Sequence, residues 1–299
     1  MKRLTFVLFG FLVAAGAIFS ASAQSIWLDD YTAAKQLAVQ TGKDILADFT
    51  GSDWCPPCMR MEEEVFTQPD FIKNAPRKYV LLRVDYPHKL KLPDRVRLQN
   101  QALAERYPFD GVPTFVLMDA QGRAFGRAVG YVEGGPKAFF ALLEGLEKQK
   151  AELARLQGAA ESAAGEEKAK ALDVLFTQAD DWGIAYRFAA LPAEIETLDK
   201  NNALGLHEKY QILGEYTYLL NSWTQNSDFN AAVTQVHALA ARAKPYPRLQ
   251  AKILLTEGMI YLNALNDETS AKRTFQKVVE LGAETPEGQQ ASQLLDQLP

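Results

Sequence analysis

The sequence predicts an α/β domain in its first half and an all-helical domain in its second half. In residues 24–150, short apolar runs of strand length alternate with stretches whose apolar residues recur at helical spacing. From residue 151 onwards these strand-like runs disappear, and alanine, leucine, glutamate, glutamine and lysine dominate. We therefore place a domain boundary near residue 150 and expect domains over 24–150 and 151–299.

The first domain is expected to form a mixed sheet with helices between its strands. Strand-like runs cover residues 45–49, 79–85, 114–118 and 124–129, and helical spacing covers 30–41, 56–66, 95–107 and 136–150. The tetrapeptide Asp119-Ala120-Gln121-Gly122 has the composition of a hairpin turn, so the last two strands are expected to be antiparallel.

Helical patterns continue to the end of the second domain. They predict helices over residues 171–179, 204–223, 229–243, 247–265, 268–281 and 286–298. Residues 158–165 are rich in alanine and glycine, which predicts a helix break or loose joint there. Short polar turns between the last helices indicate antiparallel helix hairpins.

Residues 1–23 have the pattern of a cleaved secretory signal peptide. A basic start, Met1-Lys2-Arg3, precedes an apolar run over residues 4–20, and Ala21-Ser22-Ala23 supplies a small-x-small cleavage site. The alternative is an uncleaved membrane anchor, although the run is short for a transmembrane span. We expect a periplasmic or secreted protein.

Composition excludes several classes of function. The formal net charge is −5 with basic residues scattered along the chain, so we expect no nucleic-acid binding. The two cysteines lie too close together to brace a fold of this size, and two thiolates do not complete a four-ligand zinc site. No phosphate loop or dinucleotide fingerprint occurs, so we expect neither a metal nor a cofactor.

Both cysteines lie in the pentapeptide Trp54-Cys55-Pro56-Pro57-Cys58. Proline suits the first turn of a helix, and two thiols three positions apart at that turn lie on one face. A helix N-terminus favours the thiolate through its free N–H groups and its dipole. This is the minimum machinery for exchanging a disulfide with another protein.

Four motifs in order resemble the thioredoxin family. They are Asp48-Phe49, Trp54-Cys55-Pro56-Pro57-Cys58, Gly111-Val112-Pro113-Thr114 and Val129-Gly130. The resemblance implies a thioredoxin fold for the first domain. The sequence Gly51-Ser52-Asp53 before the motif is similar to the secreted bacterial branch of the family.

The resemblance implies catalytic roles for three residues. Cys55 is expected to be the more exposed nucleophile, and Cys58 the thiol that resolves the mixed disulfide. Asp48 resembles the buried carboxylate that relays a proton, with a strand-end acid facing solvent as the alternative. It lies seven positions before Cys55 where the family has six, and the family's basic partner falls on Leu81. Arg83, on the same strand face as Leu81, is expected to compensate.

The resemblance also implies a substrate-binding surface. Pro113 matches the family's cis-proline, which exposes the backbone of Val112 for pairing with an extended client segment. Gly130 matches the glycine that leaves room for the client, and Trp54 is expected to form an apolar wall beside the sulfur.

The residues between the cysteines favour reduction over oxidation. Pro57 resembles reducing thioredoxins, and no histidine lies between the cysteines to stabilise the thiolate. The expected partners are client proteins with disulfides or thiols and an unidentified redox partner. The alternatives are an oxidase or isomerase of the same fold, or an adaptor with a vestigial redox site.

The second domain resembles tetratricopeptide repeats. The matching positions are Gly258, Tyr261, Ala271, Phe275 and Val278, with one extra residue in the turn, and Leu213-Gly214 with Tyr218 and Ala232 suggests an earlier copy. The resemblance implies a concave surface that holds a protein partner. The alternatives are a helical bundle particular to this chain, and a cap that only stabilises the redox domain.

Overall fold

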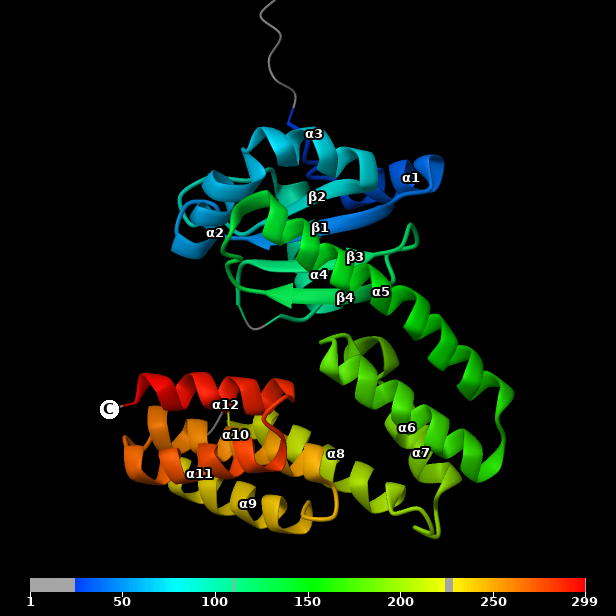
Figure 1. Cartoon of the computed structure of the whole chain (residues 1–299), viewed down its shortest axis with the longest axis vertical. Coiled ribbons are helices and arrows are strands. Elements are labelled where there is room, and N and C mark those ends of the chain that lie inside the picture. The colour runs from blue at the N-terminus through cyan, green and yellow to red at the C-terminus, as the bar shows by residue number, and fades with distance from the viewer. Residues whose placement is uncertain (1–24, 110, 224–227, 299) are drawn as a thin grey trace, which may run out of the picture.

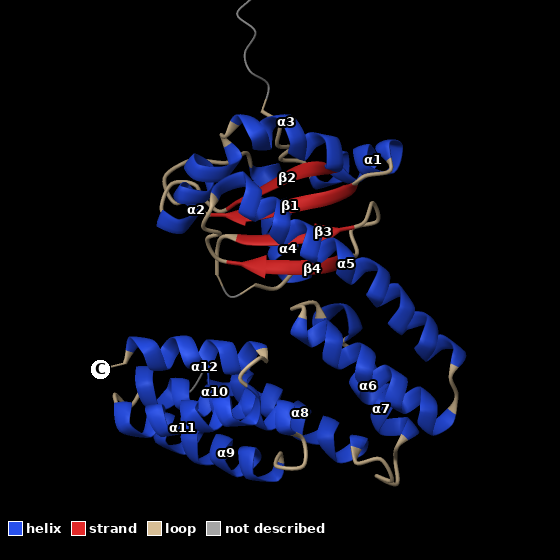
Figure 2. Ribbon diagram, in the orientation of Figure 1, coloured by secondary structure: helices blue, strands red, loops and turns tan. Residues whose placement is uncertain are grey.

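The computed structural model describes residues 25–109, 111–223 and 228–298. An α/β unit is followed by an array of helices (Figures 1 and 2), which confirms the predicted fold class. The expected signal segment, 1–23, lies outside the described residues. Within the described ranges, no helix combines the length and the apolar character needed to cross a bilayer.

A four-stranded mixed sheet forms the centre of the α/β unit, in the order β2-β1-β3-β4. Its strands are β1 (Asp44–Thr50), β2 (Tyr79–Asp85), β3 (Thr114–Met118) and β4 (Ala124–Val129). β1 and β2 are parallel, whereas β3 is antiparallel to both β1 and β4. The ends of β1, β2 and β4 and the start of β3 therefore lie at one end of the sheet.

Helices cover both faces of this sheet (Figure 2). They are α1 (Tyr31–Thr41), α2 (Pro56–Met61), α3 (Pro69–Lys78), α4 (Asp94–Arg106) and α5 (Gly135–Ser162). On one face Phe66 and Phe139 pack over Phe115, with ring centroids 4.9 to 5.9 Å apart. On the other face Tyr107 packs against Phe49 at 6.1 Å. Aromatic side chains thus take part in the core packing on both faces of the sheet.

Two local features of the α/β unit differ from the predicted pattern. The helix expected over 56–66 is α2 followed by a π-helical turn, Glu62–Phe66. Helix α3 was not predicted, because Pro76 in its interior argues against a helix when the sequence is read alone.

Helix α5 is longer than predicted. Its helical pattern was expected to end at residue 150, but the helix continues to Ser162, so the predicted domain boundary lies inside one helix. The reason is that Leu153, Leu156 and Ala160 continue the buried stripe of this helix beyond that point. The helix ends at Ser162 and the next helix, α6 (Gly165–Asp181), begins shortly after it, within the stretch where a helix break was predicted.

The rest of the chain is helical among the described residues. A 3₁₀ turn (Ala185–Phe188) and α7 (Leu191–Leu198) were not predicted. The last five helices begin and end within two residues of the predicted positions: α8 (Leu206–Trp223), α9 (Phe229–Arg242), α10 (Pro247–Asn263), α11 (Glu268–Gly282) and α12 (Pro286–Gln297). The C-terminal helices share one apolar core, and a smaller core joins α6, α7 and the start of α8.

The beginning of the helical region packs onto the α/β unit. Ala179 and Ile184 are fully buried in the same apolar core as the sheet. The ring of Tyr186 lies 6.3 Å from that of Tyr107, edge to face. This part of the second predicted domain is therefore attached to the first by apolar contact.

Helices α10 and α11 approach each other closely at Gly258. A Cβ atom at this position would lie 2.4 Å from Cε1 of Phe275, whose side chain is fully buried. Gly214, in α8, is the opposite case, because a Cβ there would meet nothing within 4 Å.

These two glycines give a matched test of the helical packing. Gly258→Ala is expected to lower the free energy of unfolding by about 1–3 kcal/mol, because Phe275 has no free space into which to move. Gly214→Ala is expected to raise it by about 0.5–1 kcal/mol, because alanine favours an exposed helix. Urea denaturation followed by far-ultraviolet circular dichroism measures both changes. Equal effects of the two substitutions would contradict the close approach at Gly258.

Candidate functional site

Cys55 and Cys58 form a disulfide at the start of α2, with their Cα atoms 5.3 Å apart. Cys55 is the N-cap residue of this helix, and the amide nitrogen of Cys58 lies 3.3 Å from the Cys55 Sγ. Pro56 and Pro57 occupy the first helical positions, where a missing amide hydrogen costs nothing. Once the disulfide is reduced, the helix terminus favours the thiolate at Cys55.

The two cysteines are equally buried in this disulfide form. Each exposes 3% of its surface, so the expectation that Cys55 is the more exposed is wrong for this state. The Cys55 Sγ lies 3.4 Å from the carbonyl oxygen of Val112, which covers the sulfur from the side of the β3 entry loop. Trp54, which is 40% exposed, and Pro56 are the exposed residues of the motif.

The loop before β3 lies against the disulfide as the family resemblance implies. The Val112–Pro113 peptide bond is cis. The amide of Gly130 donates to the carbonyl of Pro113 at 2.8 Å, which joins the loop after β4 to the loop before β3. Gly130 has φ of +93°, and a Cβ there would meet nothing within 4 Å, so the surface beside Pro113 is open.

Trp54 is held by contacts of its ring and of its nitrogen. Its Nε1–H donates to the carbonyl of Tyr86 at 2.7 Å, and its ring stacks on His88 with centroids 4.5 Å apart and planes 5° apart. A Cβ at Gly51 would lie 2.5 Å from the indole, so only glycine fits there. The wall predicted beside Cys55 is thus fixed to the loop that follows β2.

Asp53 fixes the same loop. Its carboxylate accepts the amides of His88, Lys89 and Leu90 at 2.8, 2.7 and 2.9 Å. Sequence reasoning did not identify Asp53 or His88 as part of the site, and no local signal marks them because the partners are more than thirty positions apart. Their link depends on the parallel pairing of β1 and β2.

Asp48 is buried rather than facing solvent, with only 1% of its surface exposed. Its Oδ2 lies 3.6 Å from Nε of Arg83, the residue directly opposite it on β2. Burial raises the pKa of Asp48 to about 7, although the positive charge of Arg83 acts in the other direction. Arg83 is therefore the basic residue beside Asp48, at a position two residues after Leu81, where the family pattern has its basic partner.

A cavity of about 500 Å³ lies beside the second cysteine and is reached by Arg83, the partner of Asp48. Cys58, Glu62 and Arg83 are among the residues that line it. Arg83 extends its guanidinium from Asp48 towards Glu62, whose carboxylate accepts from Nη2 at 2.5 Å. The cavity is large enough for several water molecules, and the charged groups of Glu62 and Arg83 offer them hydrogen-bond partners.

Tyr131 joins the loop after β4 to α2 and to the π-helical turn that follows it. Its hydroxyl donates to the carboxylate of Glu64, and the guanidinium of Arg60 lies 3.8 Å from its ring centroid. The next amide, that of Val132, lies 3.3 Å from the sulfur of Met61. The loop containing Gly130 is thereby held in place beside the disulfide.

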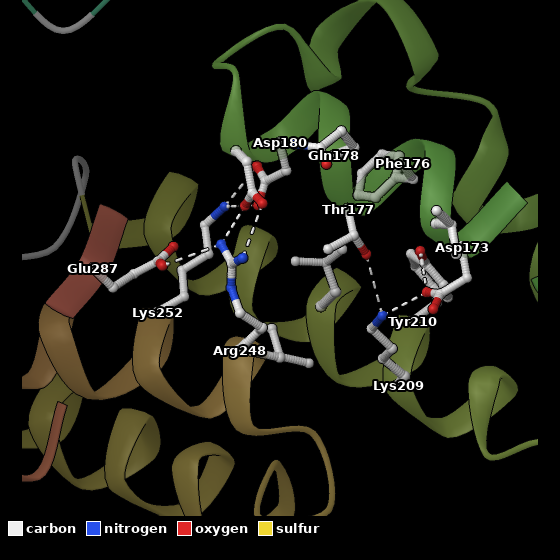
Figure 3. Close-up of a pocket in the computed structure, with 14 residues that line it drawn as sticks. Asp173, Phe176, Thr177, Gln178, Asp180, Lys209, Tyr210, Arg248, Lys252 and Glu287 are labelled. Carbon is white, nitrogen blue, oxygen red and sulfur yellow. Dashed lines mark hydrogen bonds and ion pairs between the residues drawn. The ribbon is translucent and has the colours of Figure 1, made fainter. Parts of the chain in front are cut away.

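The helical region holds a separate charged cavity of about 290 Å³ between α6, α8, α10 and α12 (Figure 3). Lys252 donates to Asp180 at 2.7 Å, and Lys209 donates to Asp173 at 2.5 Å. Arg248 pairs with Asp181. Since each cation has an acidic partner, the cluster is an ion-pair network that joins α6 to α8 and α10.

No metal centre is formed by the parts of the chain that the structure describes. Groups of three or more histidine, cysteine, aspartate or glutamate side chains with a suitable arrangement do not occur there.

Asp48 gives a pH-dependent prediction. Because the pKa of Asp48 is raised in the folded protein, ionising it costs stability; the cost is absent below pH 4, grows between pH 4 and 7, and is complete above pH 7. Asp48→Asn is therefore expected to stabilise the protein at pH 8, relative to wild type, by on the order of 4 kcal/mol, with no gain at pH 4. Asp94→Asn, at a side chain that is 88% exposed, is the control. Denaturation curves at both pH values measure the difference, and a pH-independent effect of Asp48→Asn would contradict the raised pKa.

Comparison with known proteins agrees with this geometry. Residues 31–147 match the family described as thioredoxin-like domain. The disulfide bond reductase DsbH of Chlamydia pneumoniae is 32% identical over 118 residues, which is 40% of this chain and 70% of that protein. The thioredoxin-related protein DsbJ of the same organism is 33% identical over 98 residues, which is 33% of this chain and 28% of that protein.

A solved structure titled DsbH oxidoreductase aligns with a TM-score of 0.39 at 28% identity, covering 47% of this chain and 95% of that one. The matched segment in both sequence comparisons is less than half of this chain, and the family match covers the α/β unit. With its cysteine pair, its fold and its similarity to DsbH, this chain belongs to the thioredoxin-like family.

Proposed function

We propose that this chain is an exported thiol–disulfide oxidoreductase that reduces disulfides in client proteins. The observation that carries the proposal is the Cys55–Cys58 disulfide at the start of α2, beside the Val112–Pro113 loop. Two further features support it: the buried Asp48, and the name of the related disulfide bond reductase DsbH.

The proposed reaction passes two electrons from the dithiol to the client. The Cys55 thiolate attacks one sulfur of the client disulfide, which forms a mixed disulfide and releases the other client sulfur as a thiolate. The Cys58 thiolate then attacks the Cys55 sulfur, which forms the Cys55–Cys58 disulfide and releases the second client thiolate. A thiol-containing redox partner must reduce the pair before the next cycle.

Asp48 is proposed to accept the proton that Cys58 loses in the second step. A carboxylate whose pKa lies at about 7 matches the pH at which it would work as a general base. Support comes from the cavity lined by Cys58, Glu62 and Arg83, which offers water a place to carry the proton to the leaving thiolate.

Client binding is assigned to the surface around the cis-proline. The backbone of Val112 is proposed to pair with an extended client segment as an added strand. The open space at Gly130 accommodates the segment, and the indole of Trp54 provides an apolar wall. Pro113 fixes this arrangement against the disulfide.

The direction of exchange is proposed from chemistry at the motif. Pro57 precedes Cys58, and no histidine lies between the cysteines to stabilise the reduced form, so a low reduction potential is expected. An oxidase or isomerase is the alternative. An adaptor with a vestigial site is disfavoured by the presence of both cysteines, Trp54 and the cis-proline.

The location and the role of the helical region are parts of the same proposal. The pattern of residues 1–23 supports export to the periplasm or beyond. Large exposed apolar side chains on α8 and α9, namely Tyr218, Leu220 and Phe229, favour a protein-binding role of the tetratricopeptide type. The contact of Ile184 with the sheet core supports the alternative, a brace for the redox unit.

Serine variants of the two cysteines test the mechanism. Cys55→Ser is expected to abolish insulin reduction, because the thiol that attacks the client disulfide is lost and Cys58 alone cannot form the Cys55–Cys58 disulfide. Cys58→Ser is expected to accumulate a mixed disulfide with insulin, because nothing resolves it. Turnover is followed by the precipitation of the insulin B chain, and the adduct by non-reducing electrophoresis. Insulin reduction by wild type at the rate of Cys55→Ser would exclude the enzymatic function.

Equilibration with glutathione tests the direction. We expect a reduction potential closer to the value of thioredoxin, about −270 mV, than to that of the oxidant DsbA, about −120 mV. Alkylation of free thiols followed by mass spectrometry gives the fraction reduced at each ratio of the two glutathione forms. A potential above about −150 mV would assign the chain to the oxidases instead.

A further inference from the structure

We propose that the loop of residues 88–91, the basic loop, recognises acidic side chains near the disulfide of the client protein. The proposal rests on the proposed function and adds the class of client. The loop consists of His88, Lys89, Leu90 and Lys91 and follows β2 at the end of the sheet that carries the cysteine pair.

The basic loop is anchored from inside the site. Three successive amides of the loop point at the carboxylate of Asp53, at 2.7 to 2.9 Å. The imidazole of His88 lies flat on Trp54. The backbone of the loop is thus bound to Asp53, and the side chains of Lys89 and Lys91 are exposed to solvent.

Among the residues that the structure describes, Lys89 and Lys91 have no acidic partner. Asp94 and Asp30 form their ion pairs with arginines instead. Asp53 is occupied by the backbone of the loop itself. The chain as a whole carries a net charge of −5, so within its described part these two lysines are exposed cations without an ion-pair partner on an acidic protein. Uncompensated cations at a rim attract a partner of opposite charge and repel one of like charge.

The basic loop is within reach of a client bound at Cys55. Trp54 is the residue next to Cys55, and His88 stacks on it at 4.5 Å. An extended client advances about 3.3 Å with each residue, so side chains two to four positions from the client cysteine reach the loop. Leu90, which is 61% exposed, adds an apolar contact between the two lysines.

Three synthetic peptides test this inference. Each contains the same disulfide-closed ring, flanked on both sides by two glutamates, two glutamines or two lysines. The pre-reduced full-length protein is mixed with each peptide at pH 7.5, and the single-turnover rate constant is measured by tryptophan fluorescence. Each rate is divided by the rate of the same peptide with dithiothreitol, which removes the intrinsic reactivity of the disulfide.

We expect wild type to react about tenfold faster with the glutamate peptide than with the lysine peptide, after this normalisation. The ratio is expected to fall below one in Lys89→Glu/Lys91→Glu and to approach one in 0.5 M NaCl, where charges are screened. The matched control Lys244→Glu/Lys277→Glu changes the net charge equally at exposed positions of the helical region, and it is expected to keep the wild-type ratio.

Two results would overturn the proposal while leaving the proposed function intact. One is exchange with the glutamine peptide but equal normalised rates with the two charged peptides. The other is an equal loss of preference in the control variant, which would assign the effect to net charge. Absence of exchange with all three peptides would overturn both the basic loop and the proposed function.

Discussion

The register of the central sheet determines where every part of the candidate site lies. The loop with the cysteines follows β1, the basic loop follows β2, the cis-proline loop precedes β3 and the Gly130 loop follows β4. All four meet because the strands are paired at that end of the sheet. The pairs are Thr50 with Asp85, Phe49 with Thr114, and Thr114 with Val129. A shift of one residue in β1 would also move Asp48 to the other face of the sheet and away from α2.

The same register separates two kinds of electrostatic environment. Below the disulfide, Asp48 is buried beside Arg83, its partner across β1 and β2, and burial controls the pKa of the acid. Above it, the Asp53 carboxylate accepts hydrogen bonds from backbone amides, and the lysines of the basic loop are exposed to solvent. In the function that we propose, charge inside the fold serves the proton chemistry and charge on the rim serves the choice of client.

The helical region is continuous with the redox unit in its packing. Helix α5 begins on the sheet and ends beyond it, and the end of α6 returns to the sheet core through Ala179 and Ile184. The C-terminal helices have their own core, and ion pairs such as Lys252 with Asp180 link them back to α6. A partner held by the last helices would therefore be held by a body that is fastened to the redox unit at several points.

The amino-acid sequence was enough to predict the fold class, the exact bounds of three of the four strands, and the cysteine pair with its cis-proline, because these depend on local pattern and on motifs that lie in order. The folded structure was needed to show that Asp48 is buried beside Arg83 and does not face solvent, that Asp53 and His88 belong to the site, and that both cysteines are covered in the disulfide form. Likewise α3 and the true end of α5 depend on buried contacts that outweigh a proline and a change in composition. These features are made by residues far apart in the chain, and the free energy that fixes them comes from burial and hydrogen bonds that exist only after the strands have paired.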